Sequence, residues 1–462
     1  MMTLLQEGQL NLTSLGLDSG IPQDEHLRSC SGMYKPRFAP YMVIRFKPFQ
    51  GQNISNRGNL SKNMDKAIAV SKDVFWVGVN DRETYLFEGL WPLPYGVSYN
   101  SYVILDKKVV VLDTVKFTTT GQYMDKVRDL LCGRDVDYLV INHMEPDHSG
   151  SIRTMMEAYP KMTIIGNEKT ARFLENFYGI TERVKIVKDG EILDIGRHKL
   201  QFHITPMVHW PETMMTYDMT DRILFSADAF GGFGTLDGGI FDDEINIKFY
   251  VEEIERYFTN IIAKFSPMVQ SALKKLSGLD IAIVASTHGP IWRKNPDFIV
   301  NYYDRLSKQE TEQGVVIIYG TMYGNTKRMA EEIASGVVAE GIKDIRIFDA
   351  SKTHLSYIIN SVWKYKGIVI GSCTYNAGMY PPISQLVHFM EKSRTSNRVI
   401  GVFGSYSWSG EAIKELEAFA RGGNCKFVEP AIKALACPKE DDLAALYELG
   451  RRIAREVLAP PK

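Results

Sequence analysis

Two histidines and two carboxylates stand within six residues of the stretch INHMEPDHSG (141–150), as His143, Glu145, Asp147 and His148. Imidazole and carboxylate groups are the side chains with which proteins bind transition metals. In an extended loop, alternation places the first three of these side chains on one side and the fourth on the other. The spacing therefore predicts a metal site in which one strand end serves two ions.

Three residues of the same chemistry follow later in the chain. They are His209 in MVHWPETM, Asp228 in FSADAF and His288 in ASTHGP, each at the expected end of a strand. Any one of them, taken alone, also fits a structural role such as capping a turn. The hypothesis of a metal site therefore depends on these residues meeting the first cluster.

Short strands are expected to position these residues. The apolar run DYLVI (137–141) predicts a strand that leads directly into the first cluster. SYVILDKKVVVLDTV (101–115) predicts two strands around a tight turn, and a helix is expected near 121–132. Further strands are expected at MTIIGN, RVKIV, EILDI, LQFHIT, RILFSADAF and DIAIVASTHGP. Groups of strands with helices between some of them indicate a layered α/β sandwich.

After the polar segment SKQETEQG (307–314), strands and helices alternate. Strands are expected at VVIIYG, IRIFDA, GIVIGS and VIGVFGS, with helices at about 326–340, 354–361, 383–392 and 410–421 and a last helix that ends near 457. This alternation is typical of a doubly wound parallel sheet. We therefore expect an N-terminal extension of unknown role (1–64), a first α/β domain (65–310) and a second (311–462).

A second candidate site opens the later domain. The segment VVIIYGTMYGNTKRMAEEIA places the residues Thr321–Thr326 between a strand and a helix. Hydroxyl groups and backbone N–H groups at a helix N-terminus bind anions, and the helix dipole assists. The loop has no Walker lysine and no G-x-G-x-x-G motif, which argues against nucleotide hydrolysis and a dinucleotide site. A plain strand–helix turn is the alternative.

Composition limits the class of protein. The chain has 462 residues, 45% hydrophobic and 24% charged, and a formal net charge of -1, which gives no electrostatic case for nucleic acid or a membrane surface. No apolar run approaches the roughly 18 residues of a membrane helix. The five cysteines are Cys30, Cys132, Cys373, Cys425 and Cys437. Because none forms a C-x-x-C pair, we expect a reduced, cytoplasmic setting and no zinc knuckle or rubredoxin-like module.

The seven candidate ligands as a set resemble those of a known family. Residues from about 66 to 305 are similar to the metallo-β-lactamase-like domain of the flavodiiron proteins, which carries His-x-Glu-x-Asp-His and then His, Asp and His at intervals that here are 60, 18 and 59 residues. The resemblance implies an αββα sandwich. It assigns His143, Glu145 and His209 to one iron, Asp147, His148 and His288 to the other, and Asp228 as a bridge.

The second domain resembles the flavodoxins over nearly all of 314–462. The resemblance implies a doubly wound parallel sheet that holds FMN at the carboxyl ends of its strands. It assigns the flavin to three loops, formed by Thr321, Met322, Tyr323, Gly324, Asn325 and Thr326, by Ser372, Thr374, Tyr375, Asn376 and Ala377, and by Ser405, Tyr406, Ser407, Trp408 and Gly410. Tyr406 or Trp408 is a candidate to stack on the flavin ring.

The combined resemblance implies an oxidoreductase that reduces O₂ to water, NO to N₂O, or both. Electrons would reach the irons through FMN from a separate donor, such as rubredoxin or another redox carrier or reductase. The family pairs chains head to tail so that each flavin faces the irons of the other chain, and a homodimer or a dimer of dimers is therefore expected. The resemblance does not decide between O₂ and NO.

Two other functions remain open at the level of sequence. One is a zinc-dependent hydrolase of the lactamase type with an appended flavodoxin, and the other is an electron-transfer flavoprotein whose metal domain is structural. Hydrolases on this scaffold typically have His where this chain has Glu145. The additional carboxylate gives a harder, more negative ligand set, which favours iron over zinc.

One position departs from the family pattern. Many flavodiiron proteins carry a histidine in the segment that precedes G-x-S-Y-N, and Glu88 stands at that place in LFEGLWPLPYGVSYNSY. A carboxylate there would change the polarity of the metal pocket or reach an iron.

Overall fold

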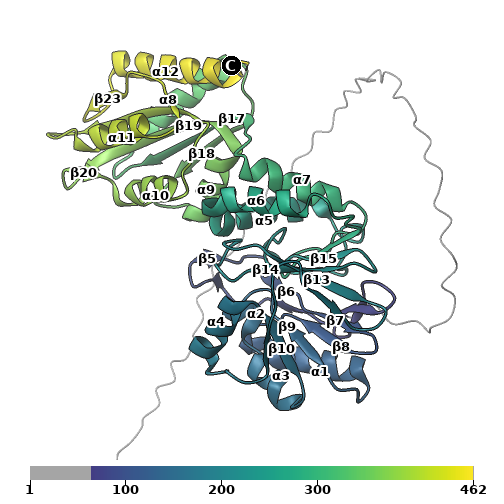
Figure 1. Cartoon of the computed structure of the whole chain (residues 1–462). Helices are drawn as coiled ribbons and strands as arrows, with labels where there is room; N and C mark the ends of the chain where they lie inside the picture. Colours follow the sequence, from purple (N-terminus) through teal and green to yellow (C-terminus); the bar gives the residue numbers. More distant parts are fainter. Residues whose placement is uncertain (1–63, 461–462) are drawn as a thin grey trace, which may run out of the picture. The chain divides into compact units, whose positions relative to one another are not determined.

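The computed structural model describes residues 64–460, and the expected extension 1–64 lies outside this range except for its last residue (Figure 1). The first part of the described chain contains two large sheets. One has the order β1-β2-β7-β8-β9-β10-β11 and the other the order β12-β13-β14-β15-β16. The strands of the first are Ile68–Ala69, Val74–Trp76, Tyr102–Leu105, Val109–Leu112, Tyr138–Val140, Thr163–Gly166 and Val184–Ile186. Those of the second are Ile192–Asp194, Lys199–Ile204, Met214–Asp218, Ile223–Phe225 and Ile283–Ala285.

Helices cover the outer faces of these two sheets (Figure 1). Those that follow the strands of the first sheet are α1 (Thr120–Leu131), α2 (Pro146–Ser149), α3 (Ile152–Ala158) and α4 (Glu168–Tyr178). Those beside the second are α5 (Ile247–Tyr257), α6 (Ser266–Leu276) and α7 (Pro296–Ser307), with a π-helical turn at Phe258–Ile262 and a 3₁₀ turn at Ala263–Phe265. The other 3₁₀ turn, Phe117–Thr119, directly precedes α1. This confirms the predicted layered sandwich.

One core fills the space between the two sheets. Strand β8 reads Val-Val-Val-Leu and is buried throughout, as expected for a strand covered on both faces. Apolar side chains of β7, β8 and β13–β15 belong to the same buried cluster. Two small hairpin-like pairs complete this part, β3 (Val79–Asp81) with β6 (Val97–Tyr99) and β4 (Leu86–Phe87) with β5 (Trp91–Pro92).

The second part contains a parallel sheet with the order β18-β17-β19-β21-β22, to which β23 adds in parallel and β20 antiparallel. Its strands β17–β23 are Glu312–Gly320, Ile345–Asp349, Tyr365–Tyr375, Gly378–Met379, Val399–Tyr406, Lys426–Phe427 and Ile432–Leu435. Its helices α8–α12 are Asn325–Ala339, Leu355–Lys364, Pro381–Lys392, Glu411–Gly422 and Glu440–Leu458. The 2-1-3-4-5 order of the main strands is the flavodoxin-like one, which confirms the predicted doubly wound sheet.

Alternation along β17 explains how this sheet is covered. Val315 and Ile317 belong to the cluster with α8 and α12, whereas Val316 and Ile318 belong to the cluster with α9, α10 and α11. Both sets are buried because successive side chains of a strand point to opposite faces. Helices α8 and α12 lie side by side on one face of the sheet (Figure 1).

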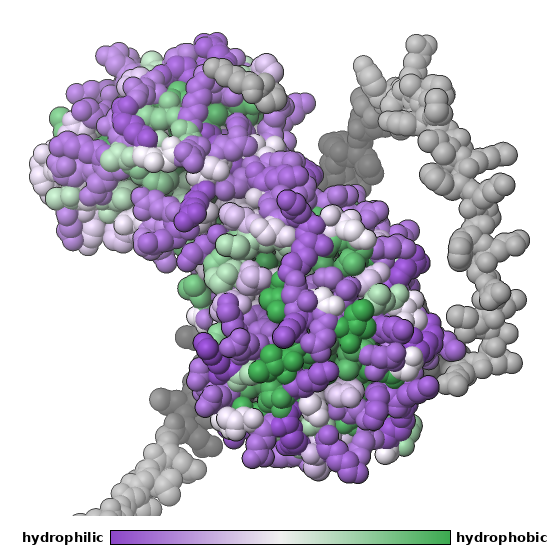
Figure 2. Space-filling model, in the orientation of Figure 1, coloured by the Kyte–Doolittle hydropathy of each residue, from purple (hydrophilic) through white to green (hydrophobic). Residues whose placement is uncertain are grey.

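The expected boundary near 310 falls between two elements, since α7 ends at Ser307 and β17 begins at Glu312. Most of the surface drawn in Figure 2 is hydrophilic, with hydrophobic side chains gathered in separate areas. Within 64–460, no helix is both long enough and apolar enough to cross a membrane.

Candidate metal centre and flavin site

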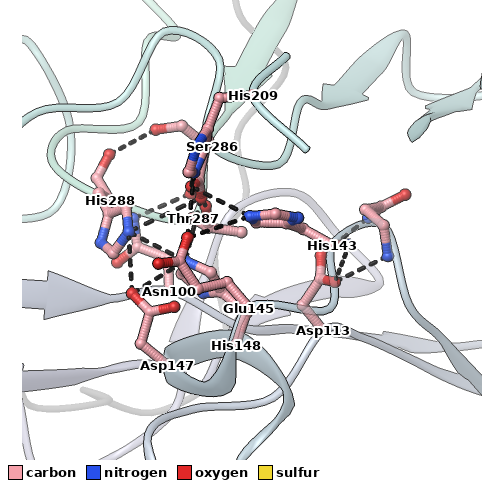
Figure 3. A network of polar contacts seen from close by, with 12 residues as sticks. Asn100, Asp113, His143, Glu145, Asp147, His148, His209, Ser286, Thr287 and His288 are labelled. Atoms are coloured by element: carbon pink, nitrogen blue, oxygen red, sulfur yellow. Dashed lines mark hydrogen bonds and ion pairs between the residues drawn. The ribbon is translucent and has the colours of Figure 1, made fainter. Parts of the chain in front are cut away.

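The candidate ligands lie where strands of the first part end. The motif 141–150 follows β9, His209 lies between β13 and β14, Asp228 follows β15 and His288 follows β16. The side chains of the six candidate ligands labelled in Figure 3 point toward one another from these separate segments; they are His143, Glu145, Asp147, His148, His209 and His288. The structure therefore brings together side chains that are up to 145 positions apart in the sequence.

The first set consists of His143, Glu145, His209 and Asp228, whose candidate ligand atoms all lie within 4.8 Å of one another. Oε2 of Glu145 is 3.3 Å from Nε2 of His143 and 3.0 Å from Nε2 of His209. All four residues are buried. This grouping agrees with the assignment of the first iron to His143, Glu145 and His209.

The second set consists of Asp147, His148 and His288. The two Nε2 atoms of the histidines are 2.9 Å apart, and Oδ2 of Asp147 is 3.4 Å from each. Neither Asp147 oxygen has a hydrogen-bond partner among the described residues. Three donor groups are thus close enough together to hold one metal ion.

Asp228 joins the two sets through its separate oxygens. Oδ2 lies 3.2 Å from Nε2 of His209, in the first set, and Oδ1 lies 3.0 Å from Nε2 of His148, in the second. The hydroxyl of Thr287 donates a hydrogen bond of 2.5 Å to Oδ1 and holds the carboxylate in place. This is the placement expected of a carboxylate that bridges two cations.

The extended-loop prediction for the first cluster is wrong beyond Glu145. Pro146 begins the short helix α2, because proline suits the first position of a helix. The helical turn places Asp147 on the side of His148 instead of the side of His143 and Glu145.

Asp113 supports the segment that precedes α2, since its Oδ1 accepts hydrogen bonds from the backbone N–H groups of Asn142 and His143.

Hydrogen bonds to residues outside the ligand set fix which ring nitrogen of His288 and of His143 faces the centre. Nδ1 of His288 donates to the carbonyl of Ser98 at 2.8 Å, and Nδ1 of His143 donates to the Glu212 carboxylate at 2.8 Å. A neutral histidine that donates from Nδ1 presents the lone pair of Nε2. Such partners orient the histidine ligands of metal sites. Glu212, which also accepts from the N–H of Met144, was not among the residues predicted from sequence.

The donor set fits a cation. Nε2 of His288, which presents a lone pair, lies 2.9 Å from Nε2 of His148, so a proton on His148 or a cation must lie between the two rings. Burial opposes charge on the imidazoles, but the carboxylates outweigh it. Asp147 and Asp228 raise the pKa of His148 to about 9, and Asp228 and Glu145 do the same for His209. The buried carboxylates therefore demand positive charge, which metal ions would supply.

Tyr257 is a second residue that the sequence analysis missed. It is buried at the end of α5, directly before the π-helical turn, and its ring centroid is 5.5 Å from that of His288. Its hydroxyl has no hydrogen-bond partner among the described residues. Burial and the carboxylates of Asp228, Glu145 and Asp147 raise its pKa well above the ordinary value. The Tyr257 hydroxyl is thus a hydrogen-bond donor without a partner among the described residues, beside the candidate metal centre.

The three predicted flavin loops meet at one cavity of about 380 Å³ at the carboxyl ends of β17, β19 and β21. Twelve of the sixteen predicted residues line it, and Gly324, Thr326, Ser372 and Gly410 do not. These four support the loops instead. The Thr326 and Ser405 hydroxyls are 3.0 Å apart, Ser372 accepts from the N–H of Tyr380, and Gly324 and Gly410 precede α8 and α11.

The cavity offers unused polar groups to a ligand. Helix α8 begins without a side-chain cap, so its first backbone N–H groups are available to a phosphate. The buried hydroxyl of Thr374 has no hydrogen-bond partner among the described residues. Cys373 and Ser409, which lie within two of the predicted loops, also line the cavity, and so does Ala436, which was not predicted. Ala436 follows β23, a strand for which we had no sequence prediction, and β23 pairs with β21 and so ends at the same edge.

Comparison with known proteins agrees with both sites. Residues 97–289 match the family described as ODP family beta lactamase, and residues 317–450 match flavodoxin. The anaerobic nitric oxide reductase flavorubredoxin of Escherichia coli O1:K1 is 35% identical over 401 residues, which are 85% of this chain and 83% of that protein. The chain belongs to the flavodiiron protein family.

Solved structures agree with this membership of the flavodiiron proteins. The rubredoxin:oxygen oxidoreductase of Desulfovibrio gigas has a TM-score of 0.82 at 27% identity, over 85% of this chain and 98% of that one. The flavodiiron protein of Giardia intestinalis has a TM-score of 0.81 at 26% identity, over 85% and 97% of the two chains.

Three aromatic residues of this flavodiiron protein differ in how they relate to the two sites. Trp210 lies edge-on to His143 with ring centroids 5.3 Å apart. Tyr217 instead donates to the carbonyl of Asp280 at 2.6 Å, and no contact of its side chain with the seven candidate ligands is found in the described part of the chain. Trp408 is 91% exposed, so it lies at the mouth of the flavin cavity and not inside it.

Proposed function

We propose that this flavodiiron protein reduces O₂ to water, NO to N₂O, or both, at a dinuclear iron site that receives electrons through FMN. The observation that carries the proposal is the pair of adjacent donor sets that share Asp228. The flavin-sized cavity in the second part supports it. So do the relatives, one named as a nitric oxide reductase and another as an oxygen oxidoreductase.

The proposed ligands are the seven side chains described above. His143, Glu145 and His209 would hold one iron, Asp147, His148 and His288 would hold the other, and Asp228 would be shared between them. Three carboxylates among seven ligands favour a metal that cycles between two charge states over zinc. Two irons and one reduced FMN would supply the electrons for either gas.

The surrounding residues position the ligands and admit the substrate. Glu212 keeps the His143 ring in one orientation. A cavity of about 600 Å³ reaches Glu145 and Asp147, and its lining is mainly apolar, which suits small apolar gases. The hydroxyl of Tyr257 is available to donate a hydrogen bond to an oxygen atom at the centre.

The three loops around the second cavity are proposed to hold FMN. The N-terminus of α8 would bind the phosphate, and the Thr374 hydroxyl would bind a polar edge of the ring. The large exposed side chains of Tyr323 and Trp408 at the cavity mouth are available for contact with another protein. We propose that this contact is a head-to-tail homodimer, alone or within a dimer of dimers, and that a separate donor such as rubredoxin or another redox carrier reduces the flavin.

The proposal is tested by loading and turnover of the purified protein. We expect two irons and one FMN per chain by elemental analysis and absorption spectroscopy. The reduced protein should consume O₂, NO or both in a gas-tight cell with an electrode for each gas, and N₂O should appear from NO. Zinc without iron, or consumption of neither gas by the reduced, iron-loaded protein, would contradict the proposal.

The dimer is tested separately by dilution. If each flavin serves the irons of the other chain, steady-state turnover per chain should fall as the monomer comes to dominate, measured beside the molar mass by light scattering. Full turnover in a demonstrated monomer would refute the head-to-tail arrangement while leaving the chemistry intact.

A further inference from the structure

Glu88, which stands where many flavodiiron proteins have a histidine, lies at the tip of the hairpin β4–β5. There it lines the cavity that reaches the candidate metal ligands. Phe87 anchors the hairpin, because its ring packs edge-on against His288 with centroids 5.4 Å apart. The cavity that reaches Glu145 and Asp147 is also lined by Glu88. The tip of the hairpin is therefore fixed next to the candidate ligands.

The backbone at the tip holds Glu88 in an unfavourable conformation. Glu88 and Gly89 have φ values of 51° and 69°, and the N–H of Leu90 donates to the carbonyl of Phe87 at 2.9 Å. These are the features of a type I′ turn, whose first central position favours Asn, Asp or Gly. A glutamate there is uncommon and strained, and strained residues concentrate at functional sites.

Two neighbours affect the Glu88 carboxyl group. The indole N–H of Trp91 donates to Oε2 at 3.2 Å. Burial and the nearby Glu145 carboxylate raise the pKa of Glu88 to about 7, and both residues line the same cavity. Glu145 in turn contacts His143 and His209 through Oε2. Two carboxylates this close repel each other, and a bound cation beside them relieves the repulsion as a proton would.

We infer that Glu88 is an additional carboxylate ligand of the first iron, the one held by His143, Glu145 and His209. His143, Glu145 and His209 would hold that iron together with the shared Asp228, and Glu88 lines the cavity that reaches Glu145. The Glu88 carboxylate would add negative charge to the first donor set and occupy space on its cavity side, which would leave the set of Asp147, His148 and His288 the more accessible of the two.

The inference rests on the proposed function, and metal binding tests it without turnover. Glu88→Gln and Glu88→Gly are to be compared with the wild-type protein by titration of the iron-loaded, full-length protein with a graded series of chelator. We expect one of the two irons per chain to be lost at about 10- to 100-fold lower chelator concentration in both variants, while the other is retained as in the wild type. The Mössbauer spectrum should change for one iron site only.

Glu83→Gln is the matched control, since it makes the same charge change in the segment before the hairpin at an exposed residue. It should leave both irons and the spectrum unchanged. Glu88→Gly also relieves the positive φ, so the metal-free form of this variant should melt at the same or a higher temperature than the wild type. Weaker iron binding together with undiminished thermal stability would identify a ligand and not a structural residue.

Two outcomes would overturn the inference in distinguishable ways. If the Glu88 variants hold both irons as tightly as the wild type, with an unchanged spectrum, Glu88 is not a ligand and the proposed function stands. If the wild-type protein takes up no iron at all, the proposed function fails and the inference fails with it.

Discussion

Two buried clusters of histidine and carboxylate in the first part of the chain look alike in composition and differ in what neutralises them. The candidate metal centre combines four histidines with Glu145, Asp147 and Asp228. The second cluster combines His198, Asp218 and Asp221. There, the guanidinium of Arg197 donates to Oδ1 of Asp221 at 2.6 Å and to Nε2 of His198 at 2.8 Å.

The two clusters differ in how many of their buried polar atoms have a partner within the protein. In the Arg197 cluster, Nδ1 of His198 donates to Asp218 at 2.8 Å, and none of its buried side-chain atoms lacks a partner. At the metal centre, both Asp147 oxygens and Nδ1 of His148 lack one among the described residues. Arg197 supplies the positive charge in the first case, whereas in the second the unpartnered Asp147 oxygens leave room for a bound cation to supply it.

The largest expected difference between the two clusters is in iron content and turnover after an Asp→Asn substitution in each. Asp228→Asn removes the charge that both donor sets share, so we expect loss of both irons and of measurable turnover. Asp218→Asn should retain the irons and turnover and lower the free energy of unfolding by about 1–3 kcal/mol. Elemental analysis, gas consumption and denaturant titration measure these quantities. Equal iron contents in the two variants would remove the distinction between the clusters.

A smaller effect is expected from the partner of a ligand. Glu212→Gln keeps an oxygen that can accept from His143 but removes its negative charge. We expect the affinity for one iron to fall about 10- to 100-fold, because charged partners raise the basicity of histidine ligands. Chelator competition measures the change. An unaltered affinity would mean that Glu212 contributes to folding alone.

The sequence predicted the residues of both sites better than their geometry. The contiguous motif around His143 and the strand ends before Asp228 and His288 carry local signals, and the structure joins them. The helical turn at Pro146 reversed the side on which Asp147 lies, because proline at a helix start outweighs simple alternation. Glu212 was missed because it contacts His143, a residue 69 positions earlier in the sequence. Tyr257 was missed because its ring packs against the ring of His288. No local sequence pattern encodes either contact.

The Arg197 cluster predicts a modest dependence of stability on pH. Burial disfavours the charged form of His198, but the Asp218 carboxylate and then Asp221 raise its pKa above the ordinary value. A histidine with a raised pKa in the folded state stabilises the protein below its unfolded pKa of about 6.5, and this contribution is lost as the pH rises through the folded value.

His198→Asn isolates this contribution, since other titrating groups cancel between variant and wild type. The difference between their free energies of unfolding should be larger at pH 6 than at pH 9, by no more than about 1 kcal/mol because charged neighbours of His198 are partly screened by solvent. Denaturant titrations at the two pH values measure it. A difference that grows with pH would show that the pKa of His198 is lowered and would contradict the account of this cluster.

The smallest effect on stability, and the one that separates function from folding most directly, concerns two buried tyrosines. The hydroxyl of Tyr303 donates to the carbonyl of Gly231 at 3.0 Å, whereas that of Tyr257 has no partner among the described residues. Tyr303→Phe should therefore cost about 1 kcal/mol in the free energy of unfolding of the metal-free protein. Tyr257→Phe should cost nothing, because it removes a buried donor that makes no bond.

Turnover should respond in the opposite order. Loss of the Tyr257 hydroxyl should lower gas consumption about threefold to tenfold, the value of one hydrogen bond, while Tyr303→Phe leaves it unchanged. A hydroxyl that is buried without a partner in the protein alone, and that matters only when iron and substrate are present, has its partner among the groups that bind at the centre. If Tyr257→Phe instead destabilises the metal-free protein and leaves turnover unaltered, the hydroxyl serves the core, and the contrast with Tyr303 disappears.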